Sequence, residues 1–350
     1  MTRRPLLTIA PAALIAPLVA SLLASVGAGC AATSSADKAA APAPLTVATL
    51  EASQATLPSA QTCRDVAIWR GDGSSATFTD VLASIADAEV VLIGETHGHP
   101  LGTAWAATLW EDLLALPARD GLRPALSLEF FERDDQSRID DYLAGLGDES
   151  VFLRRTERNP GNYPPAHRRM LEASKQAGRA VFAANAPWQM IRGLRGRDYT
   201  WLAGLTPEQQ RLYRIPPSLI GGRYRADFQA LMSGIKPGAA ATPEASSTPT
   251  PEQQARLDGS YRAQQLWDWT MADTAVRALA LGHRPVVTVV GRFHSDFTGG
   301  LPQALSQLRP GVRTVTISVV DEPAATPPAL KPDDRDRADF VIYVGPSPAN

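Results

Sequence analysis

Short apolar runs alternate with amphipathic segments along most of the chain. The clearest run, residues 90–93, is aliphatic and β-branched, as in a buried strand, and it stops at Gly94. Pro100 then suits the first turn of a helix, and apolar residues continue at helical spacing from Trp105 to Leu113. Further strands are expected at 66–69, 124–129, 179–184, 285–290, 313–320 and 339–344. This alternation predicts an α/β fold with a mainly parallel central sheet flanked by helices.

The middle of the chain follows a different pattern. Residues 188–281 lack strand signals and carry helical stretches with proline-rich breaks, ending in a long helix at 261–281. We therefore expect a smaller helical lobe inserted into an α/β domain that spans residues 61–350. Within the lobe, residues 236–252 (KPGAAATPEASSTPTPE) have the low complexity that is typical of a disordered surface insertion. Residues 150–165, which contain three prolines, are expected to be irregular.

The amino terminus has the layout of an export signal. Arg3 and Arg4 precede an apolar stretch at 6–26, and small residues at 27–29 precede Cys30. A cysteine at this place resembles a bacterial lipoprotein signal, so we expect 1–30 to be that signal and Cys30 to carry lipid. A cleaved signal without lipid and a membrane-spanning helix are the alternatives. Residues 31–60, rich in Ala, Ser, Thr and Pro, are then expected to be a disordered tether that leaves the protein exported and anchored at the cell envelope.

Composition narrows the classes of partner. The net charge is −2, so nothing indicates nucleic acid as a partner. With two cysteines, Cys30 and Cys63, the chain has neither a zinc-type cysteine cluster nor a disulfide framework.

Polar residues follow four of the predicted strands. The carboxyl ends of parallel strands meet at one edge of a sheet, so these residues are expected to share a crevice although they are far apart in sequence. Three of the five histidines of the chain are among them. The set consists of Glu95, His97 and His99 after the first strand, Glu129 and Glu132 after the second, Asn185 after the third and His294 after the fourth.

Side chains of these types can perform only a few kinds of chemistry. Imidazole and carboxylate groups bind divalent metals, and Glu95, His97 and His294 form a candidate metal site that leaves a position for water. The same groups act as general acid and base where burial separates their pKa values. Histidine and tyrosine also ligate haem iron. Taken singly, each residue has a structural alternative, such as a helix cap for Glu95 or an ion pair for Glu129.

Six motifs in this order resemble the ChaN-like haem-binding lipoproteins, whose superfamily includes the Tiki metalloproteases, the TraB proteins and the erythromycin esterases. The resemblance implies an α/β core with a small helical lobe, and an exported bacterial lipoprotein tied to haem or iron uptake. The motifs are IGETH (93–97), LEFFERDDQ (128–136), NYPPAHR (162–168), AANAPW (183–188), QQLWDWTMA (264–272) and GRFHSDFTGGLP (291–302).

The resemblance also implies roles for single residues. The polar set shared across the superfamily falls on Glu95, His97, Glu129 and His294. Cofactor-binding candidates match other motifs of the family or have suitable side-chain chemistry, and no haem axial ligand is assigned among them. These candidates are Tyr163 and His167 from the NYPPAHR stretch, Asn185 from the Asn-Ala-Pro turn, and Asp268 and Met271 from the long helix.

Two functions remain open on the sequence. In the first, a surface lipoprotein binds haem or iron for uptake. It is held at the membrane by its lipid anchor, and a second copy of the chain is a further expected partner. In the second, the protein is a metal-dependent hydrolase resembling a protease or esterase. Its catalytic residues would be Glu95, His97, Glu129 and His294, with a divalent metal activating water.

Overall fold

The computed structural model describes residues 45–233 and 250–347. The predicted signal, Cys30 and nearly all of the predicted insertion at 236–252 lie outside these residues. Within them, no helix is both long enough and apolar enough to cross a membrane.

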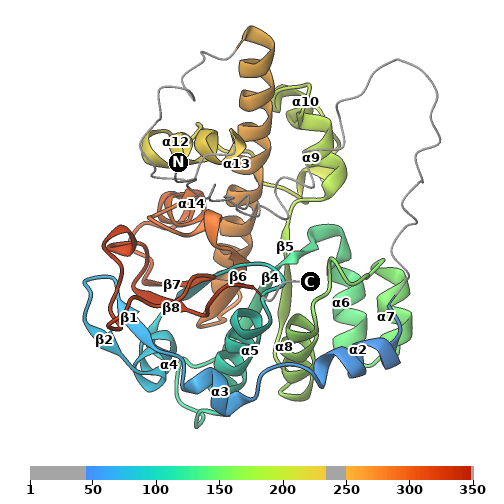
Figure 1. The fold of residues 1–350 in the computed structure, drawn as a ribbon. Coiled ribbons are helices and arrows are strands. Elements are labelled where there is room, and N and C mark those ends of the chain that lie inside the picture. Colours follow the sequence, from blue (N-terminus) through green and yellow to red (C-terminus); the bar gives the residue numbers. More distant parts are fainter. Residues whose placement is uncertain (1–44, 234–249, 348–350) are drawn as a thin grey trace, which may run out of the picture. The chain divides into compact units, whose positions relative to one another are not determined.

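An eight-stranded sheet forms the centre of the fold, in the order β2-β1-β8-β7-β3-β6-β4-β5 (Figure 1). The strands from β8 to β5 pair in parallel, whereas β1 pairs antiparallel with both β2 and β8. The predicted α/β fold with a mainly parallel sheet is thus confirmed. The strands are β1 Ile68–Arg70, β2 Ser75–Ala76, β3 Val90–Glu95, β4 Ala125–Glu132, β5 Val181–Asn185, β6 Val286–Gly291, β7 Thr314–Val320 and β8 Phe340–Tyr343.

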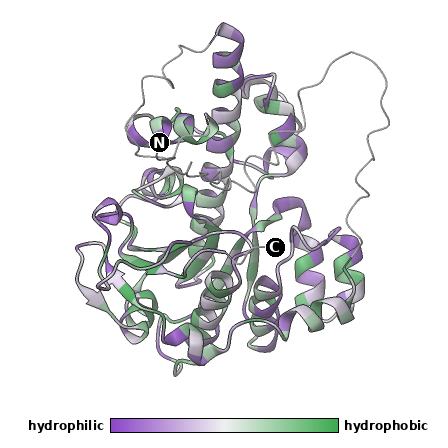
Figure 2. Ribbon diagram, in the orientation of Figure 1, coloured by the Kyte–Doolittle hydropathy of each residue, from purple (hydrophilic) through white to green (hydrophobic). Residues whose placement is uncertain are grey.

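Helices cover both faces of this sheet. Val91 and Ile93 of β3 pack into the larger core together with α5, and Val90 and Leu92 pack into a second core together with α13 and α14. Figure 2 shows the result, with hydrophobic strands inside and hydrophilic outer helix surfaces. The helices are α2 Val47–Gln54, α3 Ala60–Arg64, α4 Phe78–Asp87, α5 Pro100–Ala115, α6 Gln136–Leu143, α7 Glu149–Arg155, α8 Pro165–Gln176, α9 Trp188–Leu194, α10 Tyr199–Ala203, α11 Pro207–Gln210, α12 Gly222–Met232, α13 Pro251–Ala280 and α14 Gly300–Leu308.

Helices α9 to α13 follow one another between β5 and β6, where the sequence predicted helices without strands. Helices α9 and α10 share a small apolar core of their own with part of α13. Helix α13 begins at Pro251, earlier than the predicted residue 261, because Thr250 and Gln253 form a capping box there. Its carboxyl-terminal half contacts β4, β5 and β6, so this helix joins the helical lobe to the sheet.

Two predictions for irregular segments are corrected. Helix α2 lies within the predicted tether; it is capped by Thr46, and its Leu50 is buried in the main core. Folded structure therefore begins before residue 61, because a cap and one well-placed leucine outweigh a composition rich in alanine and threonine. Residues 149–155, also expected to be irregular, form α7, which Asp148 caps and which buries Phe152 and Leu153.

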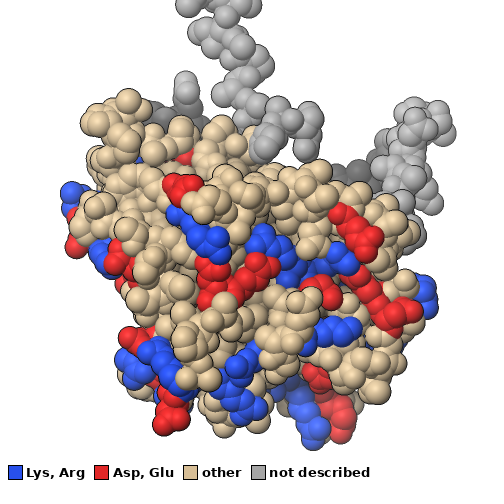
Figure 3. Space-filling model, turned by 90° about the horizontal axis from the view of Figure 1, so that it is seen from below, with Lys and Arg blue, Asp and Glu red and all other residues tan. Residues whose placement is uncertain are grey.

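Charges of both signs are interleaved on the surface seen in Figure 3. On this face lysine and arginine side chains lie next to aspartate and glutamate side chains, as the small net charge of −2 suggests. This face has no broad patch of a single sign.

Candidate functional site

Four neighbouring strands end at one edge of the sheet. Strands β3, β6, β4 and β5 lie side by side and parallel, so their carboxyl ends meet there. Glu95 closes β3 opposite Gly291, which closes β6. Strand β4 pairs with β6 only as far as Leu128, and the next side chain, that of Glu129, accepts the Gly291 N–H at 2.6 Å. Glu129 thus bonds to β6 through its side chain where regular pairing stops.

Glu95 is a fully buried carboxylate held between two imidazoles. Nδ1 of His97 lies 3.0 Å from one carboxylate oxygen, and Nε2 of His167 lies 2.9 Å from the other. His167 comes from α8 and is completely buried. Burial alone would raise the pKa of Glu95, but the two imidazoles outweigh it and hold the pKa at about 2. Glu95 is therefore ionised at neutral pH despite its burial.

Glu129 lies between His97, which it shares with Glu95, and a third imidazole, that of His294. Its carboxylate oxygens are 3.7 Å from Nε2 of His97 and 3.5 Å from Nε2 of His294. Burial opposes ionisation, but His294, His97 and the Gly291 N–H lower the pKa of Glu129 to about 2. Burial alone would lower the pKa of His294, but the neighbouring carboxylates of Glu129 and Asp268 outweigh it and raise this pKa to about 10. At neutral pH, Glu129 is therefore a carboxylate and His294 an imidazolium.

Asp268 of α13 fixes the second nitrogen of His294. Nδ1 of His294 donates to Asp268 at 2.6 Å, and the other Asp268 oxygen accepts from the Tyr224 hydroxyl at 2.8 Å and from Gln265 at 3.2 Å. Asp268 is fully buried, which raises its pKa even though His294 and Tyr224 oppose this. The helical lobe therefore reaches the sheet edge through Tyr224 and Asp268.

These contacts join six residues into one network, the carboxylate–imidazole cluster: His167, Glu95, His97, Glu129, His294 and Asp268. Its most accessible members are His97 and Glu129, whose side chains are 18% and 15% exposed. A ligand from solvent therefore meets a carboxylate that stands next to an imidazolium, a pair that can exchange protons with a substrate or accept its hydrogen bonds.

The structure brings together the four residues predicted for catalysis, Glu95, His97, Glu129 and His294. It adds His167 and Asp268, which had been predicted as cofactor-binding residues. The chemical roles of all six stay predictions, because proximity alone does not assign a reaction.

Two predicted residues are placed away from the cluster. His99 is the N-cap of α5, where its Nδ1 accepts the Gly102 N–H at 3.1 Å. Tyr163 is 1% exposed and packs against Phe131 and Phe152 in the main core. The sequence could not separate these residues from their neighbours, because histidine and tyrosine suit caps and cores as well as sites.

Three other predicted residues have structural contacts. Asn185 accepts the backbone N–H of Ala186 at 2.9 Å in the turn after β5. Met271 is completely buried in the core between the sheet and α13. Glu132 accepts the backbone N–H of Trp188 at 2.9 Å, which links β4 to the start of α9.

Some residues of the site were missed by the sequence prediction. Tyr224, at the end of the network, lies on α12, in a stretch without any strand-end signal. Phe130 follows Glu129 in the chain, and its ring meets both His97 and His167 edge-on, at 4.8 Å between centroids in each case. Neither residue type is unusual in its segment, so only the folded arrangement reveals these contacts.

The predicted metal triad is not arranged around a common point. His97 turns one ring nitrogen to Glu95 and the other toward Glu129, while His294 lies on the far side of Glu129. In the described part of the chain, no group of three or more His, Cys, Asp or Glu side chains is placed to hold a metal ion. The contacts shown are those of hydrogen-bonded ion pairs.

Aromatic rings flank the cluster. The Trp267 ring approaches that of His294 edge-on, with centroids 6.5 Å apart. Trp188 of α9 stacks on Trp267 with centroids 6.4 Å apart and an interplanar angle of 14°. Both indoles are half-buried, as is Phe130, whose ring contacts His97 and His167. The charged centre therefore has an apolar surround, as in many ligand sites.

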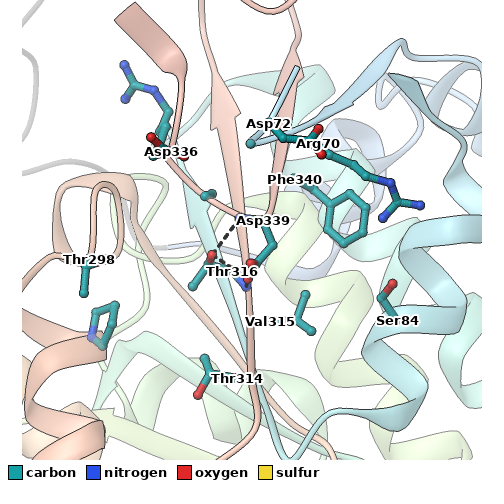
Figure 4. A pocket seen from close by; sticks show the side chains of 14 residues that line it. Arg70, Asp72, Ser84, Thr298, Thr314, Val315, Thr316, Asp336, Asp339 and Phe340 are labelled. Carbon is teal, nitrogen blue, oxygen red and sulfur yellow. Dashed lines mark hydrogen bonds between the residues drawn. The ribbon is translucent and has the colours of Figure 1, made fainter. Parts of the chain in front are cut away.

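A groove of about 580 Å³ lies elsewhere, along the first half of β7 (Figure 4). Its walls include Thr316, whose backbone N–H and hydroxyl both bond to Asp339, and the ring of Phe340. No residue of the carboxylate–imidazole cluster lines this groove.

Several solved protein structures are similar to this chain in fold. The chain of "Cofacial heme binding to ChaN of Campylobacter jejuni" has a TM-score of 0.59 and 14% identity, over 80% of this chain and 96% of that one. The type III effector HopBA1 has a TM-score of 0.40 and 15% identity, over 81% of this chain and 98% of its own. No curated protein sequence matches the chain.

One family model matches the sequence, and its description is "Haem-binding uptake, Tiki superfamily, ChaN". The match covers residues 81–305, which include β3, β4, β5 and β6, the helical lobe and the whole carboxylate–imidazole cluster. The chain therefore belongs to the ChaN family of the Tiki superfamily, described as haem-binding uptake proteins.

Proposed function

We propose that this protein binds haem as an exported lipoprotein of the bacterial envelope and serves haem or iron uptake. The observation that carries the proposal is the family match, which spans both the α/β core and the helical lobe. The signal-like amino terminus that ends at Cys30 supports export and a lipid anchor. In this role haem is the cargo that the protein carries.

The described residues offer more contact surface for the flat porphyrin ring than accessible side chains for ligating the haem iron. Half-buried rings of Phe130, Trp188 and Trp267 stand beside the cluster and offer apolar surface. All five histidines and all seven tyrosines of the chain lie within the described residues. Apart from the half-buried His97 and Tyr199, which are both hydrogen-bonded, these side chains are buried. Tyr163 and His167, the predicted ligand candidates, are 1% and 0% exposed.

A second copy of the chain is part of the proposal. The solved relative from Campylobacter jejuni is described as binding haem cofacially, that is, with rings face to face. Two chains that each carry a ring would produce such a pair. Sedimentation of the full chain with and without haemin tests this, and a monomer under both conditions would contradict it.

Haemin titration tests the proposed function directly. Added to the full chain, haemin is expected to shift its Soret band and to quench tryptophan fluorescence, because Trp188 and Trp267 flank the cluster. Half-saturation is expected at micromolar haemin or below, as for an apolar ligand on a largely preformed site. An unchanged Soret band together with unquenched fluorescence at tens of micromolar haemin would refute haem binding.

One observation favours a second candidate, a hydrolase that acts on esters or amides. Glu129 is accessible and lies 3.5 Å from His294, which Asp268 orients from the other side. Such a pair can supply general acid–base catalysis. A panel of chromogenic esters and amides, assayed with and without Zn²⁺, Mn²⁺ or Co²⁺, tests this candidate. Glu129→Gln is expected to lower any turnover by about 10²- to 10⁴-fold, and equal turnover in this variant would dismiss the cluster as its source.

A further inference from the structure

A hollow of about 470 Å³ lies on α9 and α10 of the helical lobe. Glycines make room for it. A Cβ on Gly193 would stand 2.1 Å from the Trp201 ring, whereas a Cβ on Gly196 would meet nothing within 4 Å. The edge of the Trp201 indole therefore lies against Gly193, while Gly196 borders open space. The lining residues are Gln189, Arg192, Gly193, Gly196, Arg197 and Trp201.

The hollow is positively charged. Arg192 and Arg197 are exposed, and within the described residues neither forms a salt bridge with a carboxylate. The Arg197 guanidinium lies over the Trp201 ring, 4.7 Å from its centroid. An exposed arginine on an aromatic face can move to an arriving carboxylate at small cost, and it binds such a group in a bidentate manner.

A line of aromatic rings leads from this hollow to the carboxylate–imidazole cluster. Trp188 precedes Arg192 by one helical turn, so both lie on the same face of α9. The Arg195 guanidinium lies 5.0 Å from the centroid of the Trp188 ring. Trp188 stacks on Trp267, whose edge faces His294. A flat ligand on these indoles would therefore have its charged end at the arginines and its other end near the cluster.

We infer that the hollow beside Arg192 and Arg197 is the carboxylate-binding end of a site for a planar aromatic ring, with Trp188 and Trp267 as the ring platform. This inference rests on the proposed function and deepens it, since a porphyrin with two carboxylates has the required shape and charge. The lining holds no histidine, tyrosine or cysteine. Recognition here is therefore of the ring and its carboxylates, so a porphyrin without iron binds as haem does.

The test compares three ligands on the full chain: haemin, metal-free protoporphyrin IX and its dimethyl ester. Binding is followed by tryptophan quenching and by the absorbance of the ligand. Haemin and the metal-free ring are expected to bind within about threefold of each other. The dimethyl ester, which lacks the charges, is expected to bind about tenfold or more weakly, as is typical when charged hydrogen bonds are lost. A metal-free ring that binds far more weakly than haemin would overturn the inference.

Substitutions separate this inference from the proposed function. Arg192→Glu and Arg197→Glu are each expected to weaken haemin about tenfold or more, because repulsion replaces a charged contact. Arg154→Glu is the matched control, since Arg154 is also an exposed arginine near the end of a short helix without a carboxylate partner in the described residues. If haemin binds all three variants alike, the hollow is not the site although haem binding stands. If haemin does not bind the wild type, the proposed function itself fails.

Discussion

Replacing Glu95 by alanine is expected to lower the free energy of unfolding by about 3–5 kcal/mol, the range for breaking a buried ion pair from one side. Both oxygens of this fully buried carboxylate are bonded, to His97 at 3.0 Å and to His167 at 2.9 Å. Alanine would leave two buried imidazoles without their acceptor and open a cavity between β3 and α8. Urea unfolding at pH 7, followed by circular dichroism, measures the difference. Glu51→Ala, on an exposed face of α2, is the control and should stay within about 0.5 kcal/mol of the wild type.

The pH dependence of the same residue gives an independent check. The pKa of Glu95 is about 2 in the folded protein and near 4.5 in the absence of its partners. Its stabilisation is therefore fully present above the unfolded pKa and is lost as the pH falls through the folded value. Glu95→Gln should remove this part of the acid-induced destabilisation, about 3 kcal/mol at most. If the variant and the wild type lose stability in parallel between pH 5 and pH 2, the carboxylate is not held as described.

How far the sequence predicts the site depends on which contacts topology alone dictates. Parallel strands carry their carboxyl ends to one edge, so Glu95, Glu129 and His294 could be grouped without knowing the strand order. The observed order β3-β6-β4 then places them on adjacent strands. His97 follows Glu95 so closely that it had to share the same edge.

Contacts made by helices could not be predicted in the same way. His167 and Asp268 reach the cluster because α8 packs on α5 and α13 packs on β4, β5 and β6. Neither packing angle is encoded in a local pattern of apolar residues. His99 shows the converse, since its spacing from His97 suggests a shared role, but its position before Pro100 makes it the cap of α5.

The close contact between α14 and Asp268 of the cluster predicts a second large loss of stability, on substitution of Gly300. Gly300 is the first residue of α14, and a Cβ there would lie 2.0 Å from an Asp268 oxygen and 2.6 Å from the Tyr224 ring. Both neighbours are buried and hydrogen-bonded to each other, so neither can move without breaking that bond. Gly300→Ala is therefore expected to cost about 3 kcal/mol, the upper part of the range for overpacking a core. Urea unfolding of the full chain measures this cost.

Gly147→Ala is the matched control for this substitution, because a Cβ on Gly147 would meet only Val151 at an ordinary 3.4 Å. It should leave the stability within about 0.5 kcal/mol of the wild type. Adding Tyr224→Phe to Gly300→Ala should cost less than the sum of the two single changes, since both disturb the same hydrogen bond to Asp268. Additive costs would mean that the methyl group is accommodated away from Asp268, and a stable Gly300→Ala variant would show that α14 does not press on the cluster. In either case the approach of α14 would not be what holds Asp268, and through it His294, in place.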